Sequence, residues 1–406
     1  MRAGAFLKDE ASVAARAALA IAPGVLLAGV AGGIAFPILP IVGVQAGLSV
    51  PFIGVILASN RAMRVLSSPL VGALSDRFGG RRTLIAGLVL QVAVMLLYTL
   101  GTTTGHPGVF FLLGRMLHGP GSACVFVAGQ ALALHAGGKT QGGRTAATVR
   151  AAMSIGVPLG LVAGGLVSER WGNTVTFESA LVGVLVAALV AWRLVPDLRV
   201  DVPKRLGWSE IFGAMADRRL VAIGSLTFAV SFSAQGMVLT TLSLLVHARG
   251  WSLLGFGDKG SSSLLMGLLV IASAIAMPIA GRLGDRHRAH ATFALAGLIA
   301  LVPSLLLIAL SSTAIGLVAG LVLMGFASGA LSPSLLALIG DLVPPDRRGV
   351  AVGVLQLWGD VGGTLGPLVG TVLFAGGFRT AYLATAVLLA CFIPLAARLV
   401  RWNARA

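Results

Sequence analysis

Asp360 lies deep inside a long apolar run, and four arginines occupy comparable positions. The arginines are Arg61, Arg64, Arg115 and Arg150. A charged side chain inside an apolar helix is costly and marks a functional site by default. A buried carboxylate can take up and release a proton, because burial favours its neutral form and a nearby cation favours its charged form. Asp360 is therefore the first candidate for a proton-carrying group, and the arginines are candidates for binding an anion or pairing with Asp360.

The patterns of common enzyme chemistries are absent from the sequence. Gly138-Lys139-Thr140 resembles the end of a phosphate-binding loop, but the required glycine five positions before Gly138 is replaced by Ala133. The sequence contains no H-E-x-x-H or G-x-S-x-G motif, and His118, His135 and His247 stand singly in apolar surroundings. We expect no enzyme activity, no cofactor and no metal site.

The elements that position these residues must cross a membrane. Of the 406 residues, 57% are apolar and only 11% are charged, and the mean hydropathy is +0.95. A soluble domain carries about 25% charged residues, so a soluble enzyme is excluded. The apolar runs are continuous rather than alternating, which excludes a transmembrane barrel. Since a spanning helix needs about 20 apolar residues, the length predicts an all-α membrane protein with twelve transmembrane helices.

Charged or Gly/Pro-rich breaks delimit the twelve apolar runs. The runs lie near residues 17–42, 50–74, 83–103, 109–135, 145–168, 175–195, 219–247, 260–283, 291–311, 314–340, 349–374 and 379–400. With the N-terminus in the cytoplasm, the opposite side holds only four basic residues, Arg170, Arg249, Lys259 and Arg379. This asymmetry predicts that both termini are cytoplasmic, and it accounts for the net charge of +16 without nucleic acid. The first helix lacks a cleavage site, and we expect it to be retained.

The chain divides into two sets of six runs. The longest polar stretch predicts an N-terminal half over residues 1–195, a cytoplasmic linker over 196–218 and a C-terminal half over 219–406. Trp208, Ile211, Phe212 and Met215 recur at helical spacing in the linker, which favours a helix on the membrane surface over an irregular tether.

Two pairs of segments show that the halves are related. PLVGALSDR at 69–77 matches PIAGRLGDR at 278–286, and GVPLGLVAGG at 156–165 echoes GGTLGPLVGT at 362–371. Parallel repeats of this kind place a substrate site between the halves, near the midplane of the bilayer, and allow transport by rocking one half against the other.

The segment GALSDRFGGRR at 72–82 resembles the signature loop of the major facilitator superfamily. Its copy GRLGDRHRAH at 281–290 keeps the Asp and Arg but loses the second Gly. The resemblance implies a major facilitator fold with two pseudo-symmetric six-helix halves, and a cytoplasmic gate formed by these segments. The gate candidates are Gly72, Asp76, Arg77, Arg81, Arg82, Asp285 and Arg286. We expect Gly72 to permit close helix packing.

Further motifs resemble those of the drug:proton antiporters in this superfamily. Arg115, followed by spaced small residues, looks like a motif of proton-coupled members. Glycines that resemble the antiporter ladder, and that are candidates for close helix packing, are Gly156, Gly160, Gly164, Gly362, Gly366 and Gly370. Leu161 stands where the first ladder normally has proline, whereas Pro367 is present in the second. Helix 1 contains no acid, so a proton acceptor must lie elsewhere or be absent.

The resemblance implies a secondary transporter of a small organic solute, with proton-coupled efflux as the leading function. The coupling candidates are Asp360, Arg115, His118 and Glu178. The candidates for lining the substrate cavity are Arg61, Arg64, Arg150, Gln235 and Gln356. We expect a monomer in a bacterial-type inner membrane, with protons and lipid as its other partners. The alternatives are transport of an anionic metabolite by the arginines and, more remotely, a receptor or assembly protein on the same scaffold.

Arg61 and Asp360 form a specific candidate pair. Each lies about 16 Å along its helix at a rise of about 1.5 Å per residue, which is near the middle of a core about 30 Å thick. Arg61, Arg64 and Ser68 share one helix face, and a face with two arginines is not expected to contact lipid. We therefore expect Arg61, helped by Arg64, to pair with Asp360 in one conformation, the alternative being that both arginines only brace the first half.

Overall fold

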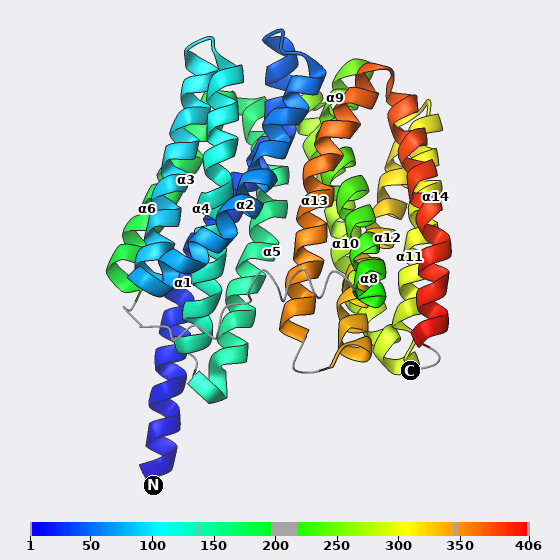
Figure 1. Ribbon diagram of the computed structural model, residues 1–406. Coiled ribbons are helices and arrows are strands. Elements are labelled where there is room, and N and C mark those ends of the chain that lie inside the picture. The colour runs from blue at the N-terminus through cyan, green and yellow to red at the C-terminus, as the bar shows by residue number, and fades with distance from the viewer. Residues whose placement is uncertain (1, 137, 196–216, 345–347, 404–406) are drawn as a thin grey trace. The chain divides into compact units, whose positions relative to one another are not determined.

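The computed structural model describes the backbone of residues 2–136, 138–195, 217–344 and 348–403, and these ranges are almost entirely helical (Figure 1). The helices of the first part of the chain are α1 Arg2–Gln45, α2 Val50–Phe78, α3 Gly80–Thr103, α4 Pro107–Ala136, α5 Gly138–Trp171 and α6 Asn173–Leu194. Those of the second part are α8 Arg218–Val230, the π-helix η1 Ser231–Val238, α9 Leu239–Arg249, α10 Asp258–His287, α11 His290–Leu310, α12 Ala314–Leu342, α13 Arg348–Ala375 and α14 Phe378–Asn403.

These elements form twelve long helical spans in the described ranges. Helices α8, η1 and α9 follow one another without a break and together make a single span, Arg218–Arg249. Ten of the spans are long and apolar enough to cross a membrane. The other two, α2 and α13, are the ones that contain Arg61, Arg64 and Asp360. The predicted fold class is confirmed.

The largest difference from the sequence prediction is at the N-terminus, where α1 begins at Arg2 rather than near residue 17. Hydropathy locates the apolar part of a helix, whereas this helix begins in a polar, alanine-rich segment that favours helical backbone without being apolar. The predicted surface helix and most of the linker, residues 196–216, lie outside the described residues, as does the side chain of Asp76.

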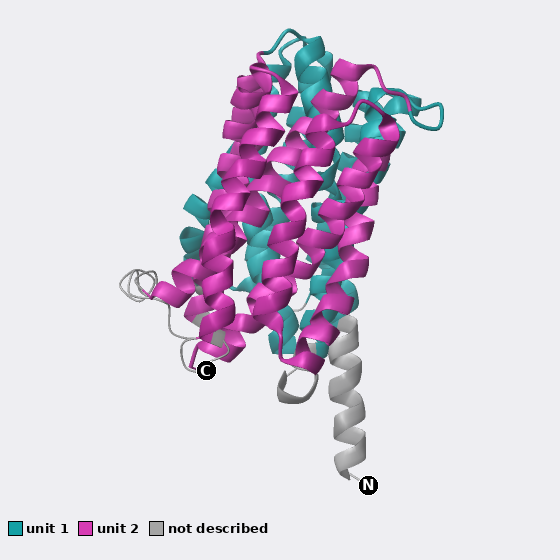
Figure 2. Cartoon of the chain, turned by 90° about the vertical axis from the view of Figure 1, so that its right-hand side faces the viewer, with its two compact units in different colours: residues 1–48, 59–203, 253–263 teal, residues 49–58, 204–252, 264–406 magenta. Residues whose placement is uncertain are grey.

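The chain separates into two compact units (Figure 2). Unit 1 contains residues 1–48, 59–203 and 253–263, and unit 2 contains residues 49–58, 204–252 and 264–406. Residues 49–58, at the start of α2, therefore belong with unit 2. The first six residues of α10 belong with unit 1.

In unit 1, α1 packs mainly on α5, and α3 packs on α4 and α6. Three buried aromatic rings join α3, α4 and α6. The ring centroids of Tyr98 and Phe111 are 5.9 Å apart, and those of Tyr98 and Phe177 are 5.2 Å apart. In unit 2, α13 packs on α8 and η1, while α11 packs on α12 and α14. Each unit thus pairs its first span with its fifth, as expected for related halves.

Candidate functional site

Arg115 is the most deeply buried charged residue among those that the structure describes in unit 1. It lies in α4 with 1% of its surface exposed, and its guanidinium carbon is 5.2 Å from the centroid of the Phe36 ring in α1. A guanidinium over an aromatic face is stabilised by the ring quadrupole, most strongly where water is excluded. Phe36 therefore orients a cation whose burial would otherwise be unfavourable.

His118 lies one helical turn after Arg115 and is also buried, with 4% of its surface exposed. A Cβ atom at Gly32 of α1 would lie 2.9 Å from His118 Nε2, so only glycine leaves room for this ring. Gln91 of α3 donates a hydrogen bond from Nε2 to the carbonyl oxygen of His118 at 3.5 Å. Among the described residues, His118 Nδ1 has no hydrogen-bond partner. This ring nitrogen is therefore a buried polar atom without a described hydrogen bond.

The arginines of α2 lie next to this part of α4. A Cβ atom at Gly119 would lie 2.5 Å from the carbonyl oxygen of Asn60 and 2.8 Å from the backbone nitrogen of Arg64. Arg61 and Arg64 are both half-buried. The Ser68 hydroxyl donates to the Arg64 carbonyl oxygen at 2.6 Å, so this hydroxyl serves its own helix. The close approach of α2 and α4 brings Arg64 and the Arg115–His118 turn into one region of unit 1.

The remaining predicted polar residues of the cavity and coupling sets lie on surfaces of the units. Arg150 is exposed and donates from Nη2 to Gln130 Oε1 at 3.3 Å. Glu178, Gln235 and Gln356 are exposed as well. Glu178 therefore does not join the buried group around Arg115.

Asp360 is buried in α13 of unit 2, with 7% of its surface exposed. Its backbone carbonyl accepts the Thr364 hydroxyl at 2.7 Å, and the adjacent Gly359 faces Ser231 at the start of η1. Arg61 is counted with unit 1 and Asp360 with unit 2, so their pairing stays a proposal.

The 72–82 segment is helical except for one residue, Gly79, which separates α2 from α3 with a φ of 87°. The Arg81 guanidinium donates from Nη2 to the carbonyl oxygen of Trp192 near the end of α6, where a cation also complements the helix dipole. Arg77 stacks on the Phe78 ring at 5.2 Å, and Arg82 is exposed. Arg81 thus braces α3 against α6 within unit 1.

Gly72 does not have the close helix contact that the sequence predicts. A Cβ atom at this position would have no described neighbour within 4 Å. The glycine lies on the half-buried side of α2 but faces open space in this structure.

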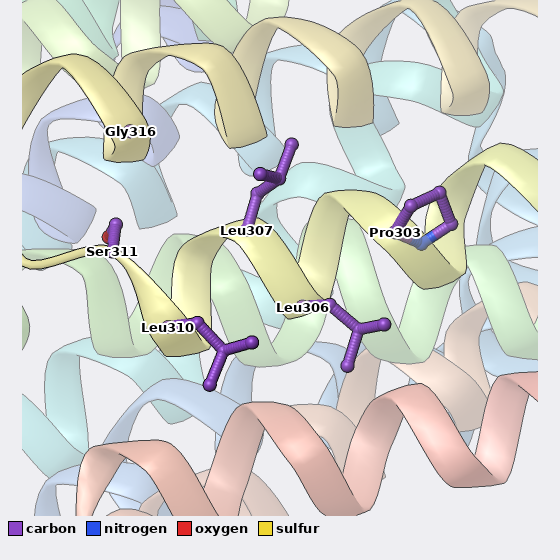
Figure 3. A pocket seen from close by; sticks show the side chains of 6 residues that line it. All are labelled: Pro303, Leu306, Leu307, Leu310, Ser311 and Gly316. Atoms are coloured by element: carbon purple, nitrogen blue, oxygen red, sulfur yellow. The ribbon is translucent and has the colours of Figure 1, made fainter.

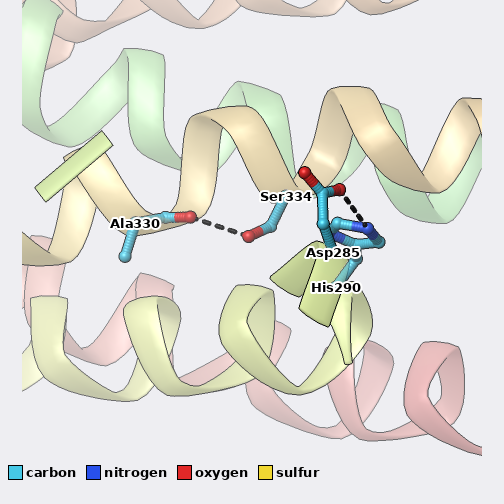
Figure 4. A network of polar contacts seen from close by, with 4 residues as sticks. All are labelled: Asp285, His290, Ala330 and Ser334. Carbon is cyan, nitrogen blue, oxygen red and sulfur yellow. Dashed lines mark hydrogen bonds and ion pairs between the residues drawn. The ribbon is translucent and has the colours of Figure 1, made fainter. Parts of the chain in front are cut away.

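The 281–290 segment contains a close contact between an acid and a histidine. Asp285 Oδ1 lies 3.3 Å from His290 Nε2; the aspartate side chain is 77% exposed and the histidine 9% (Figure 4). The same view shows the Ser334 hydroxyl donating to the Ala330 carbonyl oxygen at 2.8 Å. Arg286 is exposed. The acid of the second copy, near the end of α10, therefore contacts the histidine that begins α11.

The first glycine ladder lies against the backbone of α1. Cβ atoms at Gly156 and Gly160 would overlap the carbonyl oxygens of Leu26 and Val30, and one at Gly164 would lie 2.9 Å from the Cα of Ile34. The second ladder lies in the same way against the η1 span. A Cβ atom at Gly362 would lie 2.5 Å from the Phe228 carbonyl oxygen, and one at Gly366 would lie 2.5 Å from the Phe232 carbonyl oxygen. A Cβ atom at Gly370 would lie 2.7 Å from Met237 Cγ. Small residues at these positions let two backbones approach closely.

A polar cluster that the sequence did not reveal joins the end of α5 to the start of α10, entirely within unit 1. The Glu169 carboxylate accepts a hydrogen bond from the Gly260 backbone N–H at 3.3 Å. Lys259 Nζ donates to Asn173 Oδ1 at 2.8 Å, and the Ser168 hydroxyl donates to the same oxygen at 2.5 Å. The one available sequence signal was that Lys259 is among the few basic residues predicted to lie on the non-cytoplasmic side.

The pocket in Figure 3 lies elsewhere, along α11 and the turn to α12. Its lining residues are Pro303, Leu306, Leu307, Leu310, Ser311 and Gly316. The lining is almost wholly apolar, and none of the predicted site residues contributes to it. We assign it no role in the candidate site.

The repeated architecture agrees with comparison to known families. The family model of the Major Facilitator Superfamily matches residues 21–257 and 255–405. The chain belongs to this superfamily. It is therefore an integral membrane protein of a family of transporters.

Two similar proteins from bacteria carry names that refer to multidrug resistance, and one of these names also refers to efflux. The chain is 27% identical over 378 residues to "Multidrug resistance protein MdtG" of Klebsiella pneumoniae, covering 89% of this chain and 88% of that protein. It is 25% identical over 378 residues to "Multi-drug resistance efflux pump PmrA homolog" of Lactococcus lactis, covering 90% of each.

Solved structures show the same fold at lower sequence identity. A bacterial homologue of the human lysosomal transporter Spinster matches with a TM-score of 0.77 at 14% identity, over 96% of each chain. The human organic anion transporter MFSD10 matches with a TM-score of 0.65 at 21% identity, over 94% of this chain and 99% of that one.

Proposed function

We propose that the protein exports small organic molecules by proton-coupled alternating access. The observation that carries the proposal is the burial of Asp360, at 7% exposure, on the helix whose glycine ladder packs against the η1 span. A carboxylate in this setting changes its local electrostatics greatly when it binds or releases a proton. The names of the MdtG and PmrA-type relatives favour drugs as the solutes.

The proposed cycle uses Asp360 as the proton carrier. Protonation neutralises its charge and weakens its attraction to a cation such as Arg61, so the equilibrium between two conformations depends on the proton gradient. Arg115 and His118 form the second polar centre and would respond to the same change through α2, which contacts α4 at Gly119.

In the proposed orientation both termini are cytoplasmic, which puts the 72–82 and 281–290 segments on the inner side. The end of α5 and the start of α10 then lie on the outer side. The inner segments form one gate, and the Glu169–Lys259 cluster is part of the outer closure. The protein would work as a monomer in a bacterial-type inner membrane.

A second candidate function, transport of an organic anion, is favoured by Arg61, Arg64 and Arg115. Arg115 is almost fully buried, and Arg64 of α2 lies in the same region of unit 1. Guanidinium groups bind carboxylates and phosphates with two parallel hydrogen bonds. In this case the arginines would bind the solute directly.

Proteoliposome flux distinguishes the two functions. The purified protein is assayed with cationic, neutral and anionic solutes, with and without an imposed pH gradient. Gradient-dependent movement of cationic or neutral solutes supports proton-coupled efflux, whereas selective movement of anions supports the second candidate. Asp76→Asn provides a gate variant, expected to fold normally and to lose most flux. If the wild type moves no solute of any class and dissipates no pH gradient, the transport proposal is wrong.

A further inference from the structure

The two glycine ladders contact their partner helices with different spacing. In unit 1 the contacted residues are Leu26, Val30 and Ile34, each four positions after the last. In unit 2 they are Phe228, Phe232 and Met237, with a first step of four and a second of five. The glycines themselves are evenly spaced by four in both ladders, so the η1 span contains one more residue than α1 between its second and third contacts.

The π-helix accommodates this additional residue. The Leu239 backbone N–H bonds to the Ala234 carbonyl oxygen, five residues back, whereas the Ser231 N–H before it reaches Thr227, four residues back. A π-helical turn is the usual result of inserting one residue into an α-helix, and such turns are frequent at functional sites. The contacts with α13 are in register on both sides of the turn, so the insertion changes the helix only locally.

The turn has two structural supports. The Ser233 hydroxyl donates to the Ala229 carbonyl oxygen at 2.7 Å, and the Thr241 hydroxyl donates to the Met237 carbonyl oxygen at 2.9 Å. These side chains bind carbonyl groups next to the widened turn. Gly236 contributes close packing, since a Cβ atom there would lie 2.8 Å from the Cα of Gly366.

Gln235 lies in the widened turn and is exposed. Between Leu220 and Val246 it is the one exposed residue, and every other residue of this stretch is buried or half-buried. A helix facing lipid would show a stripe of exposed apolar residues recurring every three or four positions. A single exposed glutamine instead indicates that the side chain faces water-accessible space, because a polar amide in hydrocarbon would be unfavourable.

We propose that the inserted residue in η1 creates a substrate contact, in which the Gln235 amide hydrogen-bonds an uncharged polar group of the transported solute. The proposal rests on the transport function proposed above and adds the residue and the kind of interaction. A glutamine amide both donates and accepts, so it fits carbonyl, hydroxyl and amide groups without requiring a charge. The first half has no counterpart, because α1 lacks the additional residue.

Deleting Gln235 tests the register. The deletion should convert η1 to a regular α-helix while keeping both sides of the ladder in contact, so the thermal unfolding midpoint of the purified protein should equal or exceed that of the wild type. Deleting Leu242 from the regular helix α9 is the matched control, and it should lower the midpoint or prevent recovery of folded protein. If the two deletions destabilise the protein equally, η1 does not contain an insertion that can be removed.

Gln235→Leu and Gln235→Asn test the substrate contact without changing the length of the span. Gln235→Leu should reduce flux of solutes bearing carbonyl or hydroxyl groups at least tenfold, with little change for solutes lacking them, and Gln235→Asn should retain part of the flux. Solute-induced shifts in unfolding midpoint measure binding separately. Equal flux and equal shifts in Gln235→Leu and wild type would overturn the contact. Absence of flux in the wild type would contradict the transport proposal, while the two deletions would still report on the register.

Discussion

Gly79 and Arg288 occupy equivalent positions in the two copies of the signature segment, and both have positive φ angles, 87° and 49°. Gly79 is the single residue between α2 and α3. Arg288 is the first of the two residues between α10 and α11. Glycine adopts positive φ without a steric penalty, whereas a residue with a Cβ does not. The second copy therefore has a positive φ at this position although the glycine that adopts it easily is replaced by arginine.

This relationship predicts opposite effects of two substitutions. Arg288→Gly should stabilise unit 2 by about 1 kcal/mol, because it relieves the strained backbone, and Gly79→Ala should destabilise unit 1 by a similar amount or more. Thermal unfolding in detergent measures both. A lower unfolding midpoint for Arg288→Gly would show that the arginine side chain stabilises unit 2 by more than its positive φ destabilises it.

The glycine ladders should be sensitive to a single methyl group. Gly160→Ala and Gly366→Ala would place Cβ atoms against the carbonyl oxygens of Val30 and Phe232, and each should destabilise the protein by about 1–3 kcal/mol. Gly353→Ala is the matched control in α13, since its Cβ would have no described neighbour within 4 Å. The control should be neutral or slightly stabilising, because alanine favours helix. Equal unfolding midpoints for all three variants would contradict the packing argument.

The Glu169 carboxylate should stabilise the start of α10. It accepts the Gly260 N–H in the first turn, where a negative charge also interacts favourably with the helix dipole. Glu169→Gln should therefore cost about 0.5–1 kcal/mol of stability. Glu178→Gln, which removes an exposed carboxylate from α6, serves as the control for stability alone. A hydrogen-exchange experiment should show faster exchange at the α10 N-terminus in Glu169→Gln only, and unchanged exchange there would remove the capping role.

Arg115 should require a guanidinium and an aromatic partner. Arg115→Lys keeps the charge but loses the planar group that stacks on Phe36, so flux should fall at least tenfold while the fold is retained. Phe36→Leu should reproduce part of this loss, and Phe36→Tyr should restore it by preserving the ring face. Full activity in both Arg115→Lys and Phe36→Leu would show that the stacking has no part in transport.

Asp360→Asn should uncouple transport from the proton gradient. The variant cannot exchange a proton at this position, so accumulation against a solute gradient should be lost while exchange continues. Arg61→Asp combined with Asp360→Arg should recover assembly or partial exchange lost in each single variant. Continued accumulation by Asp360→Asn would exclude this carboxylate as the coupling group, and failure of the exchanged pair to recover anything would argue against pairing with Arg61.

Hydropathy located the helices well because a bilayer requires long, uninterrupted apolar segments. The run predicted at 291–311 corresponds to α11 at His290–Leu310, and the run at 83–103 to α3 at Gly80–Thr103. The π-helix could not be found in this way, since one added residue does not alter apolar content. The added residue is recognised from the spacing of the residues that contact each glycine ladder, which differs between α1 and the η1 span. That spacing can be compared only when the contacts are known.

The candidate site was partly accessible from residue type alone. Burial of Arg115, His118 and Asp360 follows from charged or polar residues placed in apolar runs. The bond between Glu169 and Gly260 joins residues far apart in sequence, and nothing local distinguishes that glutamate from others at helix ends. Likewise, the lack of a described neighbour within 4 Å of Gly72 depends on how other segments pack and not on its own residue type.

The close backbone contact between α1 and α5, and between the η1 span and α13, also limits how such a chain can evolve. A new side chain at a ladder glycine would disturb an interface before it could contact any solute. Under the proposed function, variation in specificity is therefore expected at positions such as Gln235, where a side chain can change while the ladder contacts stay in place. Under selection by a new toxic compound, adaptive substitutions should accumulate at exposed polar positions of the spans and be rare at the ladder glycines.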